Sequence, residues 1–554
     1  MTESLLSRPS GARPPIWAAA LAGALAGAVA IAVSELLAGL VPGFPSLVVA
    51  IGSAAIALQP PGAKDVVVAL FGTNDKAALQ VLIVAVALVI AALVGVVAAR
   101  SFARGILAFG CAGVVAAVAA LVEPGADPAA ALASAALAAL AGIVALRLLL
   151  DAAAPDRSTT PAPAEASPGR EPARAGLAEN PEWSRRRFLL LSAGTLGGVA
   201  VAGSLGRTLL VEQHPAEGVV TASRLPAAVL AGAPKLLSSG LPAPAISVAP
   251  LAGGESLSIA GLTPLVVPND AFYRIDTALL VPQVDVSGWQ LSVSGMVDHQ
   301  LTFTYDELLS MPLYEQYVTI SCVSNEVGGH LVGNALWTGV RLKDVLGTAG
   351  VRPGATQVVG RSVDGFTVGF PTAWATAPER EPLIALGMNR ELLPPEHGFP
   401  ARLIVPGLYG YVSATKWLSE IELTTRDAVD GYWIPLGWAK DGPILTQSRI
   451  DVPHDGDKLD AGPTTIAGLA WAPDRGIERV ELRIDGGPWQ AAQITRPIAP
   501  ATWVQWTLPW NAAAGGHRLE VRATDGTGTV QTAEQTAPAP DGARGHHTIS
   551  VQVG

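Results

Sequence analysis

Residues 317–329 read YVTISCVSNEVGG, a run of apolar and β-branched residues followed by Cys322 and a loop with two glycines. Such a run predicts a β-strand that ends near the cysteine. A strand followed by a loop is a typical place for a reactive side chain, because the rigid strand holds a single thiolate toward a cleft. Taken alone, a lone cysteine is more often an inert buried side chain.

Three later stretches change this assessment. They are WTGVRLKDVL at 337–346, DGFTVGFP at 364–371 and HGFPARLIVPGLYGY at 397–411, the last followed by Lys416 and Trp417. Together with the Cys322 segment, and in this order, they resemble the sulfite-oxidase-like family of molybdopterin-dependent oxidoreductases. The resemblance extends over about residues 260–554 and does not include residues 1–150.

In that family the pterin dithiolene gives molybdenum two sulfur ligands and one protein cysteine gives a third. The resemblance therefore implies that Cys322 is the metal ligand and a catalytic residue, and a soft thiolate suits such a metal. It also implies six contacts to the Mo-molybdopterin cofactor, namely Asn269, Tyr273, Ser362, His397, Arg402 and Lys416. Among these, His397 and Arg402 match the phosphate-side motif of the family, where a guanidinium suits bidentate phosphate binding.

A further candidate catalytic residue is Tyr432, in the segment GYWIPLGW at 431–438. We expect Tyr432 and Trp433 to form a wall of the cleft for a small-molecule substrate. The alternative is that these aromatic side chains pack between the two soluble domains.

The substrate class is narrowed by departures from the family pattern. Animal and plant sulfite oxidases place arginines shortly after the motif cysteine, whereas Asn325 is followed here by Glu326 and Val327. A carboxylate facing the metal would weaken the binding of the sulfite anion. Oxidation of sulfite is therefore open but not favoured. Reduction of a sulfoxide is equally open, since bacterial protein-methionine-sulfoxide reductases are similar to this family.

The first family segment also departs, because Arg-Asn-His is common there and this chain reads Arg274-Ile275-Asp276. The arginines that can supply positive charge to an anionic substrate instead are Arg274, Arg341 and Arg361.

The N-terminal part of the chain has a different character. Residues 1–150 hold 13 charged side chains, and charged residues make up only 15% of the whole chain. A helix needs ~20 apolar residues to cross a bilayer. Apolar stretches of this length predict five spans, at 15–41, 77–99, 103–122, 128–150 and 188–206. An apolar run at 45–59 is too short for a span and is expected to be re-entrant or interfacial. Membrane lipid is thus an expected partner.

The basic residues indicate an orientation. Arginines before the first span and between the second and third place these loops in the cytoplasm, so five spans leave everything after about residue 207 on the other side. The segment SRRRFL at 184–189 matches a twin-arginine export signal, whose route carries folded proteins. The alternative is a charge cluster flanking an ordinary span. We expect a multi-pass protein of the cell membrane with an extracytoplasmic catalytic domain.

Composition also limits the partners. The net charge of −10 and the lack of a long basic run argue against nucleic acid as a partner. All eight histidines follow residue 213, so the first four spans lack the usual ligands of a membrane haem. With no flavin fingerprint or cysteine cluster either, we expect a separate electron-transfer partner, either a cytochrome or quinone-linked.

The expected fold is multi-domain: an N-terminal α-helical membrane bundle, an α+β sulfite-oxidase-like molybdopterin domain and a C-terminal immunoglobulin-like β-sandwich. The boundaries are 1–150 for four spans, 151–183 for a cytoplasmic linker, 184–207 for the export signal and fifth span, 208–450 for the molybdopterin domain and 451–554 for the immunoglobulin-like domain. The last region looks like the dimerisation domain of the family, which leaves a homodimer open.

Local patterns predict individual elements in the soluble half. The central strands are Trp289–Val297, Tyr317–Cys322, Thr356–Val363, Arg402–Val405 and Ile421–Leu423, and the helices are Tyr305–Ser310 and Leu342–Ala349. The later strands are Thr465–Ala470, Glu478–Ile484, Trp503–Leu508, His517–Thr524 and His547–Val553.

Two other classes of function stay open. One is a cofactor-free, membrane-anchored interaction module descended from the same family, against which the retention of Cys322, His397, Arg402 and Lys416 argues. The other is a transport or channel protein with an extracytoplasmic sensor domain, against which the charge-poor spans argue. Metal content separates both from a molybdenum enzyme.

Overall fold

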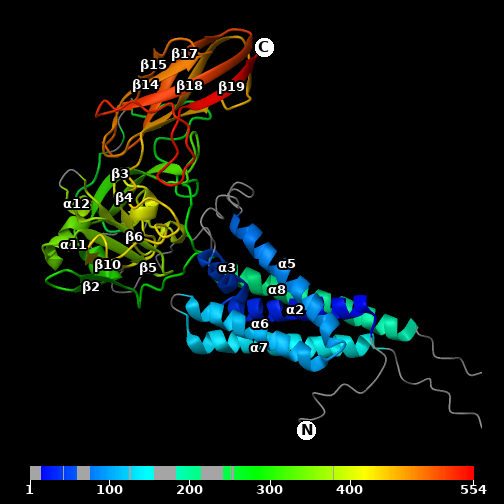
Figure 1. Cartoon of the computed structure of the whole chain (residues 1–554). Helices are drawn as coiled ribbons and strands as arrows, with labels where there is room; N and C mark the ends of the chain where they lie inside the picture. The colour runs from blue at the N-terminus through cyan, green and yellow to red at the C-terminus, as the bar shows by residue number, and fades with distance from the viewer. Residues whose placement is uncertain are drawn as a thin grey trace, which may run out of the picture. The chain divides into compact units, whose positions relative to one another are not determined.

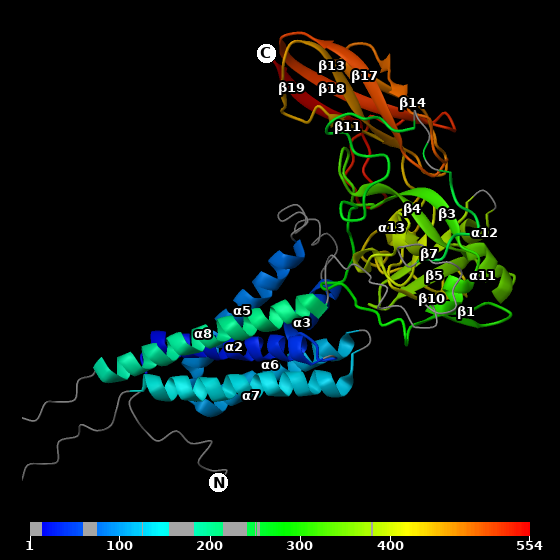
Figure 2. The same ribbon diagram turned by 180° about the vertical axis from the view of Figure 1, so that it is seen from behind.

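A computed structural model describes residues 14–41, 43–58, 75–123, 126–154, 182–213, 241–249, 251, 255–377 and 380–554. Most of the expected linker at 151–183 lies outside these residues. The chain divides into two compact units, Met1–Pro215 with Ala278–Leu280, and Ala216–Thr277 with Val281–Gly554. The first is a bundle of helices and the second is rich in strands (Figures 1 and 2).

Among the described residues of the first unit, five helices are long and apolar enough to cross a membrane. They are α2 (Ile16–Leu40), α5 (Asp75–Ala98), α6 (Phe102–Val122), α7 (Pro128–Ala153) and α8 (Glu182–Gln213). By length and composition they agree with the five predicted spans. The short apolar run forms an 11-residue helix, α3 (Leu47–Ala57), and the hydroxyl of Ser46 caps it by accepting a hydrogen bond from Val49 N.

Small residues bring the helices of the bundle into backbone contact. Helix α2 packs against α5, α7 and α8 (Figure 2). A Cβ atom at Gly23 would lie 2.1 Å from the carbonyl oxygen of Ala91 on α5, and one at Gly39 would lie 2.4 Å from that of Gly206 on α8. Glycine is therefore required at both crossings, as in many membrane bundles.

A polar cluster joins four parts of this bundle. Glu35 Oε1 on α2 accepts a hydrogen bond of 2.5 Å from Ser46 Oγ, and Glu35 Oε2 lies 3.7 Å from Arg207 Nη1 on α8. Arg207 also donates a hydrogen bond of 2.6 Å to Gln80 Oε1 on α5. The charged groups thus pair with one another inside the bundle, as ionisable residues in apolar helices usually do.

Two sheets form the central part of the second unit. The first has the strand order β2-β1-β10-β5-β6, and the second has the order β3-β4-β7-β8 with β9 also paired to β7. Their strands are β1 (Gln290–Gly295), β2 (Leu301–Thr304), β3 (Tyr314–Ser321), β4 (Val332–Arg341), β5 (Gln357–Ser362), β6 (Thr367–Pro371), β7 (Leu383–Met388), β8 (Glu391–Leu392), β9 (Arg402–Ile404) and β10 (Leu418–Thr424). All five expected central strands are confirmed.

Short helices connect these strands. They are α10 (Tyr305–Ser310), α11 (Leu342–Ala349), α12 (Thr372–Thr376), the 3-10 helix η3 (Pro395–His397) and α13 (Gly410–Ser413). Helix α10 begins with a capping box, in which Thr304 Oγ1 accepts from Glu307 N and Glu307 Oε2 accepts from Thr304 N. Helix α11 ends at Gly350, whose φ of 70° suits glycine. Both helices have the predicted bounds.

The remaining residues form two sheets that enclose their own core. The strand orders are β11-β13-β17-β16 and β12-β19-β18-β14-β15. The strands are β11 (Gln447–Val452), β12 (Lys458–Leu459), β13 (Gly462–Trp471), β14 (Ile477–Ile484), β15 (Gln490–Ala491), β16 (Gln493–Ile494), β17 (Val504–Ala512), β18 (Gly515–Asp525) and β19 (His547–Val553). We call residues 447–554 the C-terminal β-domain. Its buried core includes Ile466, Val480, Trp506 and Val521. Its immunoglobulin-like character stays a prediction.

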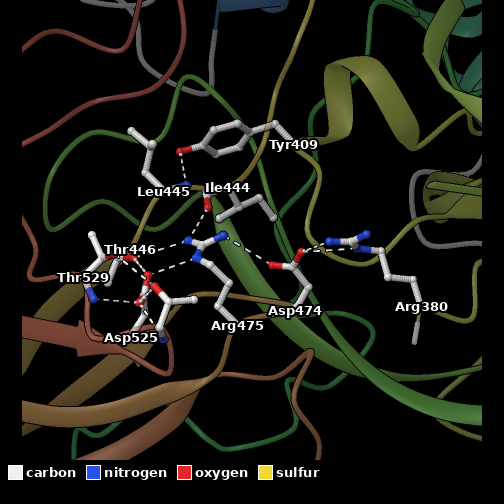
Figure 3. Close-up of polar contacts among 10 residues, drawn as sticks. Arg380, Tyr409, Ile444, Leu445, Thr446, Asp474, Arg475, Asp525 and Thr529 are labelled. Atoms are coloured by element: carbon white, nitrogen blue, oxygen red, sulfur yellow. Dashed lines mark hydrogen bonds and ion pairs between the residues drawn. The ribbon is translucent and has the colours of Figure 1, made fainter. Parts of the chain in front are cut away.

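Charged residues join the C-terminal β-domain to the central part of its unit (Figure 3). Arg380 Nη2 lies 2.8 Å from Asp474 Oδ2, and within the C-terminal β-domain Arg475 Nε lies 2.9 Å from Asp525 Oδ2. Arg475 Nη2 also donates to the carbonyl oxygen of Ile444, at 2.9 Å. Because Asp474 and Asp525 are largely buried, each needs these partners.

Candidate active site

Cys322 follows strand β3 directly and begins the loop that leads to β4. Its backbone N–H donates to Leu331 O at 2.9 Å, and its carbonyl oxygen accepts from Asn325 N at 3.1 Å. The side chain of Asn325 accepts a further hydrogen bond of 2.7 Å from Leu331 N. Antiparallel pairing of β3 with β4 and this internally bonded loop fix the backbone that carries the half-buried thiol.

Two tyrosines lie within electrostatic range of that thiol. Burial raises the pKa of Tyr273, and the charge of a Cys322 thiolate raises it further. Burial also raises the pKa of Tyr409 to about 12, with a smaller contribution from Cys322. Both phenols therefore keep their protons at neutral pH. Tyr409 lies in the 397–411 motif, but the motif itself predicts no role for it.

Arg402, on β9, is a buried cation that lacks a carboxylate partner among the described residues. Its Nη1 donates to the carbonyl oxygen of His397 at 3.0 Å, and its guanidinium lies 5.0 Å from the centre of the Trp337 ring. Its Nε is buried and has no acceptor in the described part of the chain. Burial lowers the pKa of Arg402 to about 10. A buried, unsatisfied donor on a cation is the arrangement expected where an anion binds.

His397 links two segments of the site. Its Nε2 lies 2.8 Å from the carbonyl oxygen of Asn269, and since a carbonyl only accepts, Nε2 carries the proton. Burial lowers the pKa of His397 to about 3, so the ring is neutral. Its edge also packs against Phe272, with 5.6 Å between ring centroids. His397 therefore fixes the 269–273 segment against the loop before β9.

The side chain of Asn269 is used within the protein. Its Nδ2 donates to Met388 O at 3.3 Å and to Glu391 Oε2 at 3.0 Å, and its Oδ1 accepts from Asn389 Nδ2 at 2.8 Å. In this structure Asn269 thus contributes its backbone carbonyl to His397 and its side chain to the β7–β8 turn.

A second cationic group lies beside the first. Lys416 Nζ lies 2.7 Å from Asp276 Oδ2 and donates to the carbonyl oxygen of Glu396 at 3.0 Å. Arg274 Nε lies 3.0 Å from the same Asp276 oxygen. Gly398, with φ of 113°, packs so closely on Lys416 that a Cβ atom would lie 2.9 Å from the lysine Cβ. The charges of Arg402 and Arg274 both lower the pKa of Lys416, which places the three cations in one region.

Ser362 and Tyr432 lie at the edge of this region. Ser362 Oγ accepts a hydrogen bond of 3.3 Å from Asp364 N. Asp364 is within electrostatic range of Lys416 and Asp276, and burial raises its pKa. Burial and the charge of Asp364 raise the pKa of Tyr432, whose ring packs against Phe366 and Trp433. Ser362 and Tyr432 thus join the site through Asp364, and no described contact joins either to Cys322.

The residues present fit a molybdopterin cofactor. Among the described residues there is no group of three or more His, Cys, Asp or Glu side chains that could hold a metal ion. A metal bound at Cys322 would therefore take its other ligands from a cofactor, as the dithiolene of the pterin provides. The unsatisfied Nε of Arg402, with Lys416 in the same region, would suit the phosphate of that cofactor.

Comparisons with known proteins agree with this assignment. Residues 278–433 match the oxidoreductase molybdopterin binding domain. The mitochondrial sulfite oxidase of Homo sapiens is 31% identical over 313 residues, which cover 48% of this chain and 57% of that protein. The sulfite oxidase of Arabidopsis thaliana is 29% identical over 279 residues, covering 42% of this chain and 70% of that protein.

Among solved structures, the sulfane dehydrogenase SoxCD from Paracoccus pantotrophus is 25% identical. The alignment has a TM-score of 0.46 and covers 51% of this chain and 80% of that one. The match to the human sulfite oxidase spans little more than half of the length of that relative. The matched domain implies Mo-molybdopterin as the cofactor of residues 278–433.

Proposed function

We propose that the chain is a membrane-anchored molybdenum enzyme, because residues 278–433 match the oxidoreductase molybdopterin binding domain and the chain is similar to sulfite oxidases. The observation that carries the proposal is that one half-buried thiol, Cys322, and one buried arginine, Arg402, whose Nε lacks an acceptor among the described residues, both lie within electrostatic range of Tyr273. The first suits a metal and the second suits the phosphate of its cofactor. The five apolar helices support the anchor.

Each residue near the thiol has a definite task in this proposal. When bound, the cofactor supplies two-electron oxygen-atom transfer. Cys322 holds the metal, while Arg402 and Lys416 bind the phosphate. Tyr273 and Tyr409 keep their protons at neutral pH, so they add no negative charge within electrostatic range of Cys322, and their hydroxyls remain able to donate hydrogen bonds. Neutral His397 orients the 269–273 segment, which carries Tyr273.

We propose a sulfoxide-type substrate in preference to sulfite. The three arginines available to attract an anion are each paired with a carboxylate: Arg274 with Asp276 at 3.0 Å, Arg341 with Asp344 at 2.8 Å, and Arg361 with Glu422. These pairs leave little net positive charge to concentrate a doubly charged anion. A neutral sulfoxide has no such requirement. Its reduction takes up two electrons and two protons and yields a sulfide and water.

We propose that the electrons come from a separate partner, a cytochrome or a quinone-linked protein, since the described residues contain no group of three or more His, Cys, Asp or Glu side chains that could hold a further metal ion. We propose that the active site faces away from the cytoplasm, after export guided by residues 184–189. Pairing of two C-terminal β-domains into a homodimer is part of the same proposal.

The test is the molybdenum content of the full chain, purified in detergent from a host with pterin synthesis and twin-arginine export intact. We expect about one molybdenum per polypeptide. Sulfite with an artificial electron acceptor, and sulfoxides with an artificial donor, then identify the substrate. A content near zero would overturn the enzyme and favour an interaction module descended from this family.

A further inference from the structure

The C-terminal β-domain contacts the loop that follows Cys322. Arg449, on β11, donates a hydrogen bond of 2.6 Å from Nη1 to the carbonyl oxygen of Gly329. The arginine is only 2% exposed, and its Nε lies 2.6 Å from Asp451 Oδ1. A buried, charged side chain thus donates a hydrogen bond to the backbone of the loop that begins with the candidate metal ligand.

The same ion pair also fixes a second segment. Arg449 Nη2 donates to Thr263 Oγ1 at 3.0 Å, and Asp451 Oδ2 accepts from Thr263 N at 3.1 Å. All three nitrogens of the guanidinium therefore have partners, and the side chain has a single position. A rigid donor of this kind fixes the position of its acceptor, Gly329 O.

A histidine of the C-terminal β-domain holds the preceding residue of the loop. His547 Nδ1, on β19, accepts a hydrogen bond of 3.0 Å from Ile450 N, which fixes the ring. A Cβ atom at Gly328 would lie 2.2 Å from Cδ2 and 2.3 Å from Nε2 of this ring. Gly328 also has φ of 78°, so glycine is required for the loop to pass the ring.

The strand before Cys322 is held from the same domain. Thr319, three residues before the cysteine on β3, donates its backbone N–H to Ala501 O at 2.9 Å. Its Oγ1 accepts a hydrogen bond of 2.8 Å from Trp503 N. The C-terminal β-domain therefore holds the backbone on both sides of Cys322.

We propose that Arg449 is a positioning residue for Cys322, and that the C-terminal β-domain sets the position of the metal ligand in addition to any role in pairing two chains. The inference rests on the proposed function, since it concerns a thiolate that binds molybdenum. Without Arg449, Gly329 O loses a charge-assisted hydrogen bond and Asp451 loses its partner inside the protein. The loop keeps its internal hydrogen bonds but loses this constraint at Gly329, and a shift there displaces the thiolate.

The test compares Arg449→Met and Arg449→Lys with Arg380→Met in the full, cofactor-loaded chain. Arg380 also forms an ion pair with the C-terminal β-domain, through Asp474, but it does not contact the Cys322 loop in the described structure. The measurements are the electron paramagnetic resonance of Mo(V), the alkylation of Cys322 followed by mass spectrometry, kcat and KM, and the melting temperature.

For Arg449→Met we expect a changed Mo(V) spectrum, faster alkylation of Cys322 and a kcat lowered by about tenfold with little change in KM. Arg449→Lys, which keeps the charge and folds more readily, should show the same changes to a smaller extent. Arg380→Met should lower the melting temperature and leave the spectrum unchanged.

The two proposals fail differently. A wild-type chain without molybdenum overturns the proposed function. A wild-type chain with molybdenum, together with Arg449 variants that keep the wild-type spectrum, alkylation rate and kcat, overturns the positioning role. If Arg449→Met does not accumulate, Arg449→Lys decides between these outcomes.

Discussion

Lys416 Nζ lies 2.7 Å from Asp276 Oδ2, and both side chains are almost fully buried, with exposed fractions of 9% and 3%. The resemblance to sulfite oxidases implies a histidine at the position of Asp276, so this chain places a carboxylate against the lysine that is expected to contact the cofactor. Burial lowers the pKa of Lys416 to about 8 from its ordinary 10.5, although Asp276 opposes the shift. Desolvation of the ammonium therefore outweighs its attraction to Asp276.

This shift predicts a dependence of stability on pH. Between about pH 8 and 10.5 the unfolded chain holds a proton that the folded chain has released, so the contribution of Lys416 to stability increases as the pH rises. We expect the free energy of unfolding of cofactor-free wild type, relative to Lys416→Met, to increase by on the order of 2 kcal/mol between pH 7 and pH 10. Chemical unfolding at these pH values measures it. Lys440→Met, at an exposed pair with Asp430, is the control, and a difference independent of pH contradicts the prediction.

Replacement of Arg402 should have opposite effects on the protein and on cofactor binding. In Arg402→Met the cofactor loses charge-assisted hydrogen bonds, so molybdenum occupancy should fall by about tenfold or more. The cofactor-free protein should be as stable as wild type or more so, because a desolvated cation is removed. Metal analysis and thermal unfolding measure the two effects. Arg402→Lys should have a molybdenum occupancy between those of wild type and Arg402→Met. If Arg402→Met lowers the stability of the cofactor-free protein as well as the occupancy, Arg402 has only a structural role.

Cys322→Ser tests the metal ligand. We expect this variant to fold and to retain the pterin, since the loop is held by backbone hydrogen bonds and by Asn325. Turnover should be abolished, because a hydroxyl is a poor ligand for a metal that prefers soft thiolate. Cys111→Ser, on α6, is the matched control and should leave turnover unchanged. Full activity in Cys322→Ser would exclude the ligand assignment.

The sequence predicts elements best where local signals are strong. The bounds of α10 and α11 follow from the Thr304–Glu307 capping box and from Gly350. Strands β4 and β7 were not named from the sequence, because nearly every residue of both is buried. A strand buried on both faces lacks the alternation that identifies one. Strand β11 crosses the expected boundary at 450/451, since its partner β13 comes later in the chain.

Within the site, the motifs predict residue types, but the fold decides which of them meet. Arg402, His397 and Lys416 come from one motif region and lie together. The roles of Tyr409 and Arg449 could not be predicted from local sequence, because Tyr409 comes within electrostatic range of Cys322, and Arg449 contacts Gly329, only when residues 80 or more positions apart are brought together by the fold.

The tyrosines distinguish an active site in which Tyr273 and Tyr409 act from one in which Tyr432 is the catalytic tyrosine. Tyr273 and Tyr409 lie within electrostatic range of Cys322, whereas Tyr432 is linked to the site through Asp364. We expect Tyr273→Phe and Tyr409→Phe each to lower kcat by about tenfold, the effect of one hydrogen bond of about 1.4 kcal/mol. Tyr432→Phe should change kcat by less than about twofold. Steady-state kinetics with the identified substrate measures this, and the reverse order would restore Tyr432 as the catalytic tyrosine.

The export signal can be tested apart from the charge rule that also predicts the orientation. Replacement of both Arg185 and Arg186 by lysine keeps every positive charge, so a topology set by charge alone stays unchanged. A twin-arginine signal is read as a specific pair, so the double variant should leave the C-terminal β-domain in the cytoplasm. Arg187→Lys, at the variable position of the motif, is the matched control. Digestion by an external protease of spheroplasts should reach the domain in wild type and in the control but not in the double variant. Protection of the domain in wild type would contradict the extracytoplasmic site. Digestion in wild type, in the control and in the double variant would mean that the positive charges alone set the orientation and that the segment is not read as a twin-arginine signal.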